Sequence, residues 1–138
     1  MTVFAWKPEY ALGVDEMDRQ HREIFVLLAK LEESLAGEGE GTNLRALAAV
    51  RQHALHHFCA EESLLEGVRY PNLVQQRVQH RRFVERLRQA EASASEDRLS
   101  LEEVHGLQSW ILGHVVGLDR EYLPFVTGAA GKASGEAK

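Results

Sequence analysis

The chain has 138 residues, a length that suits one domain with its own hydrophobic core. Its formal net charge of −5 argues against a nucleic-acid partner, because phosphate binding needs a basic surplus on some face. No stretch approaches the roughly 18 apolar residues of a membrane span, and residues 1–10 lack the pattern of an export signal. Cys59 is the only cysteine, so no internal disulfide can form. We therefore expect a cytoplasmic protein with no nucleic-acid or membrane partner.

The first two predicted helices carry inward-facing residues at steps of three and four, the spacing of one helical face. The first covers residues 15–35 and ends before the glycine-rich residues 37–41, which are typical of a loop. The second starts at Thr42 or Asn43, either of which can cap a helix, and ends near Gly67. Their inward faces are Met17, His21, Ile24, Leu28, Leu31 and Leu35, and then Leu47, Val50, Ala54, His57, Glu61, Leu64 and Val68.

The third predicted helix follows Pro71, a residue suited to a first helical turn. The fourth opens at Ser100, because Ser100 and Glu103 match a capping box, and Pro124 is expected to end or bend it. The inward faces are Leu73, Gln76, His80, Phe83, Leu87 and Ala90, and then Val104, Leu107, Ile111, His114 and Leu118.

No strand-like alternation competes with these four patterns. Short connections between amphipathic helices are typical of an up-down-up-down bundle. We therefore predict an all-α four-helix bundle with an N-terminal arm. Residues 1–127 form its domain and residues 128–138, which are small and polar, form a flexible C-terminal tail.

Polar residues interrupt the apolar faces of all four helices. Burying one such group without a partner costs about 1–3 kcal/mol, so the set would consume much of a typical stability of about 5–15 kcal/mol. A metal site satisfies them together, since imidazole and carboxylate are ordinary ligands. The inward polar residues are His21, His57, Glu61, Gln76, His80 and His114.

The spacing of these residues supports the same interpretation. His57 and Glu61 are four residues apart, as are Gln76 and His80, so each pair lies on adjacent turns of one face. Asp119 lies five residues after His114, about 140° round a helix, so its carboxylate would have to reach toward a neighbouring helix. A single histidine on an apolar face is more often a satisfied core residue than a ligand. His53, His56 and His105 are therefore interpreted as solvated or outer residues.

The chain resembles the hemerythrin family, most closely its single-domain bacterial members. The resemblance covers nearly the whole chain. It rests on the N-terminal arm with Trp6–Tyr10 and Gly13-Val14, on Asp18-Arg-Gln-His21, on His57-Phe58 followed by Glu61-Glu62, on Tyr70-Pro71, and on Trp110 with His114 and Asp119.

This resemblance implies a four-helix bundle with two bridged iron ions. Glu61 and Asp119 would bridge the irons, and His21 and His57 would hold the iron that keeps an open position for dioxygen. The histidines at positions 80 and 114 would hold the other iron. The family has a third histidine for that iron, four residues before the one matched by His80, and here that position is Gln76.

Three alternatives remain for Gln76. Its amide oxygen binds the second iron, or it holds a water that does, or that iron binds poorly; the first two are favoured. A separate alternative is a decayed site, which leaves a bundle with one metal or none. His53 is badly placed to substitute, because it lies beyond the other iron.

The function implied by the resemblance is reversible dioxygen binding, for storage, delivery or sensing, rather than catalysis. The alternative is a di-iron enzyme acting on peroxide, nitric oxide or ferrous iron, because Gln76 replaces an imidazole. A sensor would need a separate partner protein, which no sequence feature identifies, and a monomer is expected rather than an oligomer. Glu62 and Tyr122 are expected to support the ligands. The candidate dioxygen pocket is Trp110, Ile111, Ile24 and Leu28.

Overall fold

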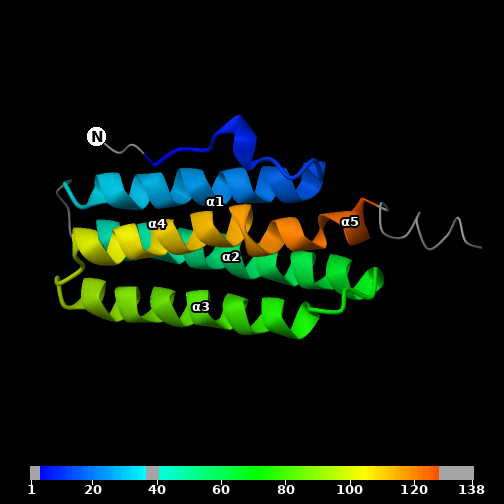
Figure 1. Ribbon diagram of the computed structural model, residues 1–138. Coiled ribbons are helices and arrows are strands. Elements are labelled where there is room, and N and C mark those ends of the chain that lie inside the picture. The colour runs from blue at the N-terminus through cyan, green and yellow to red at the C-terminus, as the bar shows by residue number, and fades with distance from the viewer. Residues whose placement is uncertain (1–3, 37–40, 128–138) are drawn as a thin grey trace, which may run out of the picture.

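The computed structural model describes residues 4–36 and 41–127, and it is all-α throughout that part of the chain. Its four long helices are α1 (Asp15–Ser34), α2 (Thr42–Gly67), α3 (Leu73–Ser95) and α4 (Leu101–Val116). They lie side by side, with α1 against α2 and α4, and α3 against the same two (Figure 1). The predicted four-helix bundle is confirmed. The predicted tail, residues 128–138, lies outside the described residues.

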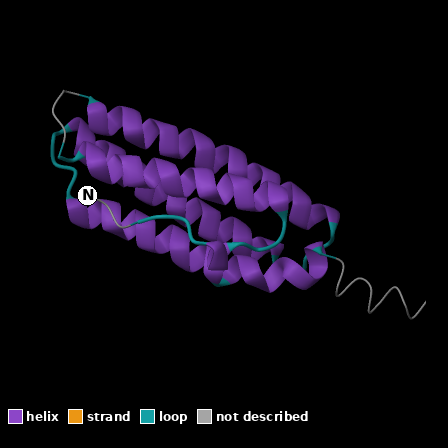
Figure 2. Ribbon diagram, turned by 90° about the horizontal axis from the view of Figure 1, so that it is seen from above, coloured by secondary structure: helices purple, strands orange, loops and turns teal. Residues whose placement is uncertain are grey.

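The N-terminal arm runs along the outside of α1, where the short helix η1 (Pro8–Tyr10) interrupts it (Figure 2). Its aromatic residues gather on one side chain of α1: Phe4 stacks on Phe25 with ring centroids 4.6 Å apart, and Trp6 meets the same ring edge-on at 5.2 Å. The buried Asp18 carboxylate accepts the backbone N–H of Leu12 at 2.7 Å. A buried charged acceptor of this kind fixes the arm to the first turn of α1.

The helix boundaries follow from local chemistry, with two corrections. The capping box predicted at α4 is present, since the Ser100 hydroxyl accepts the Glu103 N–H and the Glu103 carboxylate accepts the Ser100 N–H. The predicted cap of α2 by residue 42 or 43 is wrong: Gly41, at φ 80°, is the cap residue and no side chain bonds there. Pro71 lies in the turn before α3 rather than in its first turn.

The end of α4 also differs from the prediction. Helix α4 stops at Val116, and the chain continues through η2 (Leu118–Tyr122) into α5 (Leu123–Val126), whose first turn contains Pro124. Pro124 therefore starts a new short helix and does not end the fourth one. A side chain at position 117 would place its Cβ 2.7 Å from the Gly113 carbonyl oxygen, so this turn requires glycine.

Two apolar clusters fill the interior, with the polar residues between them. The larger cluster includes Ile24, Phe58 and Ile111, and the smaller one includes Leu65 and Tyr122. On α2, Leu65 is fully buried and Leu64, the predicted inward residue, is only partly buried. Within the described ranges, no helix is long and apolar enough to cross a membrane.

Candidate metal centre

All seven residues predicted as metal ligands lie together in the polar layer of the bundle. Their relative exposures are low: His21 0%, His57 1%, Glu61 0%, Gln76 0%, His80 2%, His114 6% and Asp119 0%. They come from all four long helices and from η2. Burial of so many polar side chains requires compensation from within the cluster.

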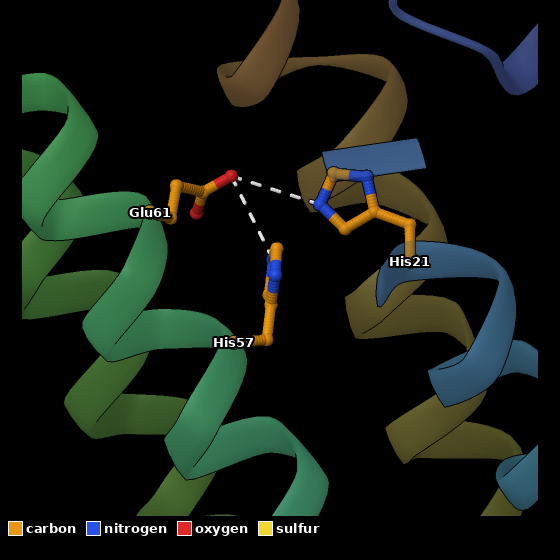
Figure 3. A group of neighbouring side chains, drawn as sticks. All are labelled: His21, His57 and Glu61. Atoms are coloured by element: carbon orange, nitrogen blue, oxygen red, sulfur yellow. Dashed lines mark ion pairs between the residues drawn. The ribbon is translucent and has the colours of Figure 1, made fainter. Parts of the chain in front are cut away.

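The first half of the cluster is formed by α1 and α2. The Nε2 atoms of His21 and His57 lie 3.6 Å and 3.7 Å from the same oxygen of Glu61, Oε2. Figure 3 shows His21 reaching from α1 and His57 from α2, with Glu61 one turn further along α2. These three residues offer ligand atoms within 4.8 Å of one another, which is compatible with one metal ion.

The second half of the cluster lies between α2, α3 and α4. His80 Nε2 is 2.9 Å from Glu61 Oε1, and His80, His114 and Glu61 offer a second set of ligand atoms within 4.8 Å of one another. Glu61 belongs to both sets, with one carboxylate oxygen turned toward each. The geometry is therefore that of two neighbouring cation positions that share a carboxylate.

Asp119 joins the same two halves. Its Oδ2 lies 3.1 Å from His21 Nε2 and its Oδ1 lies 3.1 Å from His114 Nε2. The sequence placed Asp119 to one side of a continuous helix, and this reasoning was wrong because α4 ends before it. The turn at Gly117 instead carries Asp119 to full burial. Both carboxylates thus contact histidines from both halves.

Hydrogen bonding inside the protein leaves several of these atoms unsatisfied. Buried atoms with no hydrogen-bond partner within residues 4–36 and 41–127 include the Nε2 atoms of His21, His57 and His114, Oδ2 of Asp119 and Oε1 of Gln76. His21 and His114 come within 3.1 Å of Asp119 oxygens and still form no hydrogen bond. Each orphaned group costs about 1–3 kcal/mol. The donor set of imidazole nitrogens and carboxylate oxygens fits a pair of transition-metal ions, which would satisfy these atoms together.

The electrostatics of the cluster agree with this fit. Burial lowers the pKa of His57 to about 3, so its imidazole is neutral at pH 7. Burial alone would also lower the pKa of His21, but the adjacent Asp119 and Glu61 carboxylates raise it to about 9. Burial opposes ionisation of Glu61, yet the surrounding histidines hold the pKa of its carboxyl well below its usual range. Neutral His57 and ionised Glu61 are in the protonation states that bind cations, whereas His21 must first lose its proton.

Three outer contacts orient the inner side chains. Gln20 Oε1 lies 2.6 Å from His57 Nδ1, Glu62 Oε2 lies 2.7 Å from His80 Nδ1, and the Tyr122 hydroxyl donates to Glu61 Oε2 at 2.7 Å. Such contacts fix the ring orientation of metal-binding histidines. Glu62 and Tyr122 stand where the sequence reasoning expected support. Gln20 was missed, and its position next to His21 was the only signal for it.

Gln76 lies in the second half of the cluster. Its Nε2 donates to Asp119 Oδ1 at 3.0 Å, and its Oε1 is buried and unpartnered. The amide is thus held beside His114, which is 3.1 Å from the same Asp119 oxygen. This position is compatible with direct binding of the amide oxygen to a metal ion, or with a water molecule between the amide oxygen and that ion.

The four pocket candidates differ in burial. Ile24, Leu28 and Ile111 are fully buried in the larger apolar cluster. Trp110 is partly buried and stacks on His114, with ring centroids 4.7 Å apart and planes 12° apart. Trp110 packs against the same apolar cluster and, through His114, against the second half of the metal cluster.

Of the three remaining histidines, two are peripheral. His56 and His105 are exposed, and His105 lies 3.6 Å from Glu32. His53 is partly buried, and burial lowers its pKa. None of the three belongs to the candidate ligand groups within the described part of the chain.

Comparison with known proteins points to one family. The family model described as "Hemerythrin HHE cation binding domain" matches residues 12–126. The bacteriohemerythrin of Clostridium acetobutylicum is 27% identical over 128 residues, which covers 88% of this chain and 99% of that protein. The myohemerythrin of Riftia pachyptila is 22% identical over 119 residues, with 86% and 90% covered. A crystal structure of wild-type hemerythrin superposes with a TM-score of 0.84 at 19% identity, covering 91% of this chain and 99% of that one.

Proposed function

The chain belongs to the hemerythrin family, and from that premise we propose that it binds dioxygen reversibly at a di-iron centre in the polar layer. The observation that carries the proposal is the sharing of two carboxylates between two sets of histidines. In this proposal Glu61 and Asp119 would help to hold both metal ions, since each contacts histidines of both halves. The free and exposed Cys59 suits a reducing compartment, and we place the protein in the cytoplasm as part of the proposal.

The two halves have different roles in this proposal. His21 and His57 would hold the iron that keeps an open position, because their half has no counterpart of Gln76, whose amide lies in the other half. His80, His114 and the side chain at position 76 hold the other iron. Two iron ions, when bound, supply the electrons and the coordination position that dioxygen binding needs.

The protein's own residues supply the surroundings of that position. Ile24, Leu28 and Ile111, each 0% exposed, belong to the larger apolar cluster, and in this proposal they keep water from the open position. The Tyr122 hydroxyl holds one oxygen of Glu61, and Gln20 holds the ring of His57. Burial and the neighbouring carboxylates raise the pKa of Tyr122, so its hydroxyl stays protonated and serves as the donor.

Metal content and optical spectroscopy test the proposal. The reduced, iron-loaded protein should bind about two irons per chain, gain a visible absorption in air and lose it under vacuum through repeated cycles. His57→Ala should abolish the change, because it removes a nitrogen from the open-position half. His56→Ala is the matched control, since this exposed neighbour lies on the same helix. Wild-type protein that holds two irons and never responds to oxygen would refute reversible binding.

A second candidate, an enzyme acting on peroxide, nitric oxide or ferrous iron, is favoured by one observation. Gln76 donates to Asp119 where the family pattern has a histidine, so the second iron has one imidazole fewer. Catalytic loss of added peroxide or nitric oxide, with rapid irreversible bleaching in air, would favour this function over oxygen carriage. Sensing requires a partner protein and remains a prediction, as does the monomeric state.

A further inference from the structure

A groove of about 370 Å³ opens between α3 and α4, on the side of the second half of the cluster. Its wall on α3 includes Gln75 and Gln79, which directly precede Gln76 and His80 in the sequence. Its wall on α4 includes Ser109, Trp110 and Gly113, and His114 itself lines the groove. The groove therefore reaches from solvent to the ring of one proposed metal ligand, whose Nε2 is itself buried.

Three features make this groove different from an ordinary surface hollow. His114 is 6% exposed, more than any other residue of the cluster. The helix backbone at Gly113 is uncovered, because a Cβ placed there meets no atom within 4 Å. The wall also combines an apolar face, the Trp110 ring, with the polar side chains of Gln75, Gln79 and Ser109. A mixed lining of this kind admits small polar molecules.

Gln76 does not line the groove, and it lies in the same half of the cluster as His114, since both contact Asp119 Oδ1. Its Oε1 is fully buried and has no partner in the described structure, although its Nε2 is bonded to Asp119. An amide oxygen is a weaker ligand for iron than imidazole. Between the groove and the metal position stand the His114 ring and, in place of a third histidine, a weaker amide donor.

We propose that the α3/α4 groove is a second entrance, through which small polar or anionic metal ligands bind the iron held by His80 and His114. This inference rests on the proposed function, since it requires an iron in that half. The inference goes beyond the proposed function, because the same protein would then bind an external ligand on both irons. Gln76 and Gly113 are the residues of this chain that make the second position accessible.

Azide is the probe, and the iron-loaded ferric protein is titrated while its visible absorption is recorded. Two azide-binding events are expected in the wild type. Gly113→Phe fills the groove and should abolish the second event, and Gly113→Ala is the matched control that changes the helix equally but leaves the groove open. Ser109→Phe blocks the same groove one turn earlier and guards against a folding defect in the first variant. Gln76→His should also abolish the second event by supplying a stronger ligand.

A readout that needs no iron accompanies the titration. Trp6 and Trp110 are the two tryptophans, so in a Trp6→Phe background the fluorescence reports on the groove wall alone. Quenching of this fluorescence by acrylamide should decrease with Gly113→Phe and stay unchanged with Gly113→Ala.

The outcomes separate the two proposals. Two irons per chain with a single azide event, or with a second event that Gly113→Phe and Gln76→His leave intact, would overturn the groove inference alone. Fewer than two irons in a well-folded wild type would overturn the proposed function and this inference with it. Unchanged acrylamide quenching in Gly113→Phe would show that the groove does not admit small molecules.

Discussion

Tyr122→Phe is the substitution whose effect the structure specifies most closely. The Tyr122 hydroxyl is fully buried and donates to Glu61 Oε2 at 2.7 Å. That oxygen has no other hydrogen bond in the described structure, because its contacts with His21 and His57 are 3.6 Å and 3.7 Å long. Removing the hydroxyl therefore leaves a buried, ionised oxygen without a donor.

The expected cost follows from this contact. A hydrogen bond to a charged group contributes about 1.5–3 kcal/mol, so we expect the free energy of unfolding of the metal-free protein to fall by about 2 kcal/mol. For a domain of this length the melting temperature should fall by about 6–10 °C. Iron should reduce the difference, since a cation on Glu61 replaces part of the lost stabilisation.

Urea unfolding followed by circular dichroism measures the effect. Tyr70→Phe is the matched control: Tyr70 is also a buried tyrosine of the smaller apolar cluster, and its hydroxyl forms no hydrogen bond in the part of the chain described. We expect the control to change the unfolding free energy by less than about 0.5 kcal/mol. Equal unfolding midpoints for wild type and Tyr122→Phe, or a larger loss in the control, would refute the role given to this contact.

The remaining predictions concern the second half of the cluster, the turn after α4 and the charge of the site. Gln76→His should slow autoxidation and raise iron retention during dialysis against a chelator; unchanged iron content and autoxidation rate would show that position 76 is not critical. Gly117→Ala should lower iron content and stability, because its Cβ would lie 2.7 Å from a carbonyl oxygen and displace Asp119, and far-ultraviolet circular dichroism with metal analysis checks this. Metal uptake at pH 7.5 should release about one proton or more per chain, because His21, with a pKa raised to about 9, must lose its proton to bind metal. Protonated His21 stabilises the metal-free fold fully below the ordinary histidine pKa of 6.5, and this stabilisation is lost as the pH rises through about 9. At pH 10 His21 is already neutral, so a pH-indicator dye should record less proton release on metal uptake than at pH 7.5. Equal proton release at pH 7.5 and pH 10 would contradict this prediction.

Much of this protein can be read from periodicity alone. Residues three and four apart share a helical face whatever surrounds them, so the four helices and the inward placement of His21, His57, Glu61, Gln76, His80 and His114 follow from local sequence. The same rule explains the errors on those helices. The inward face of a helix can continue through either of two adjacent residues, and on α2 the buried residue is Leu65 rather than Leu64.

Only the tertiary structure decided how the inward residues meet. The position of Asp119 depends on the turn at Gly117, which no helical periodicity describes, and its sharing by His21 and His114 depends on how α1 and α4 pack. The partner of His57 on α1 and the half of the cluster that Trp110 covers are likewise contacts between helices. Sequence spacing determines which face a residue occupies, because that is a property of one helix. Which atoms meet across the bundle is a property of the packed helices together.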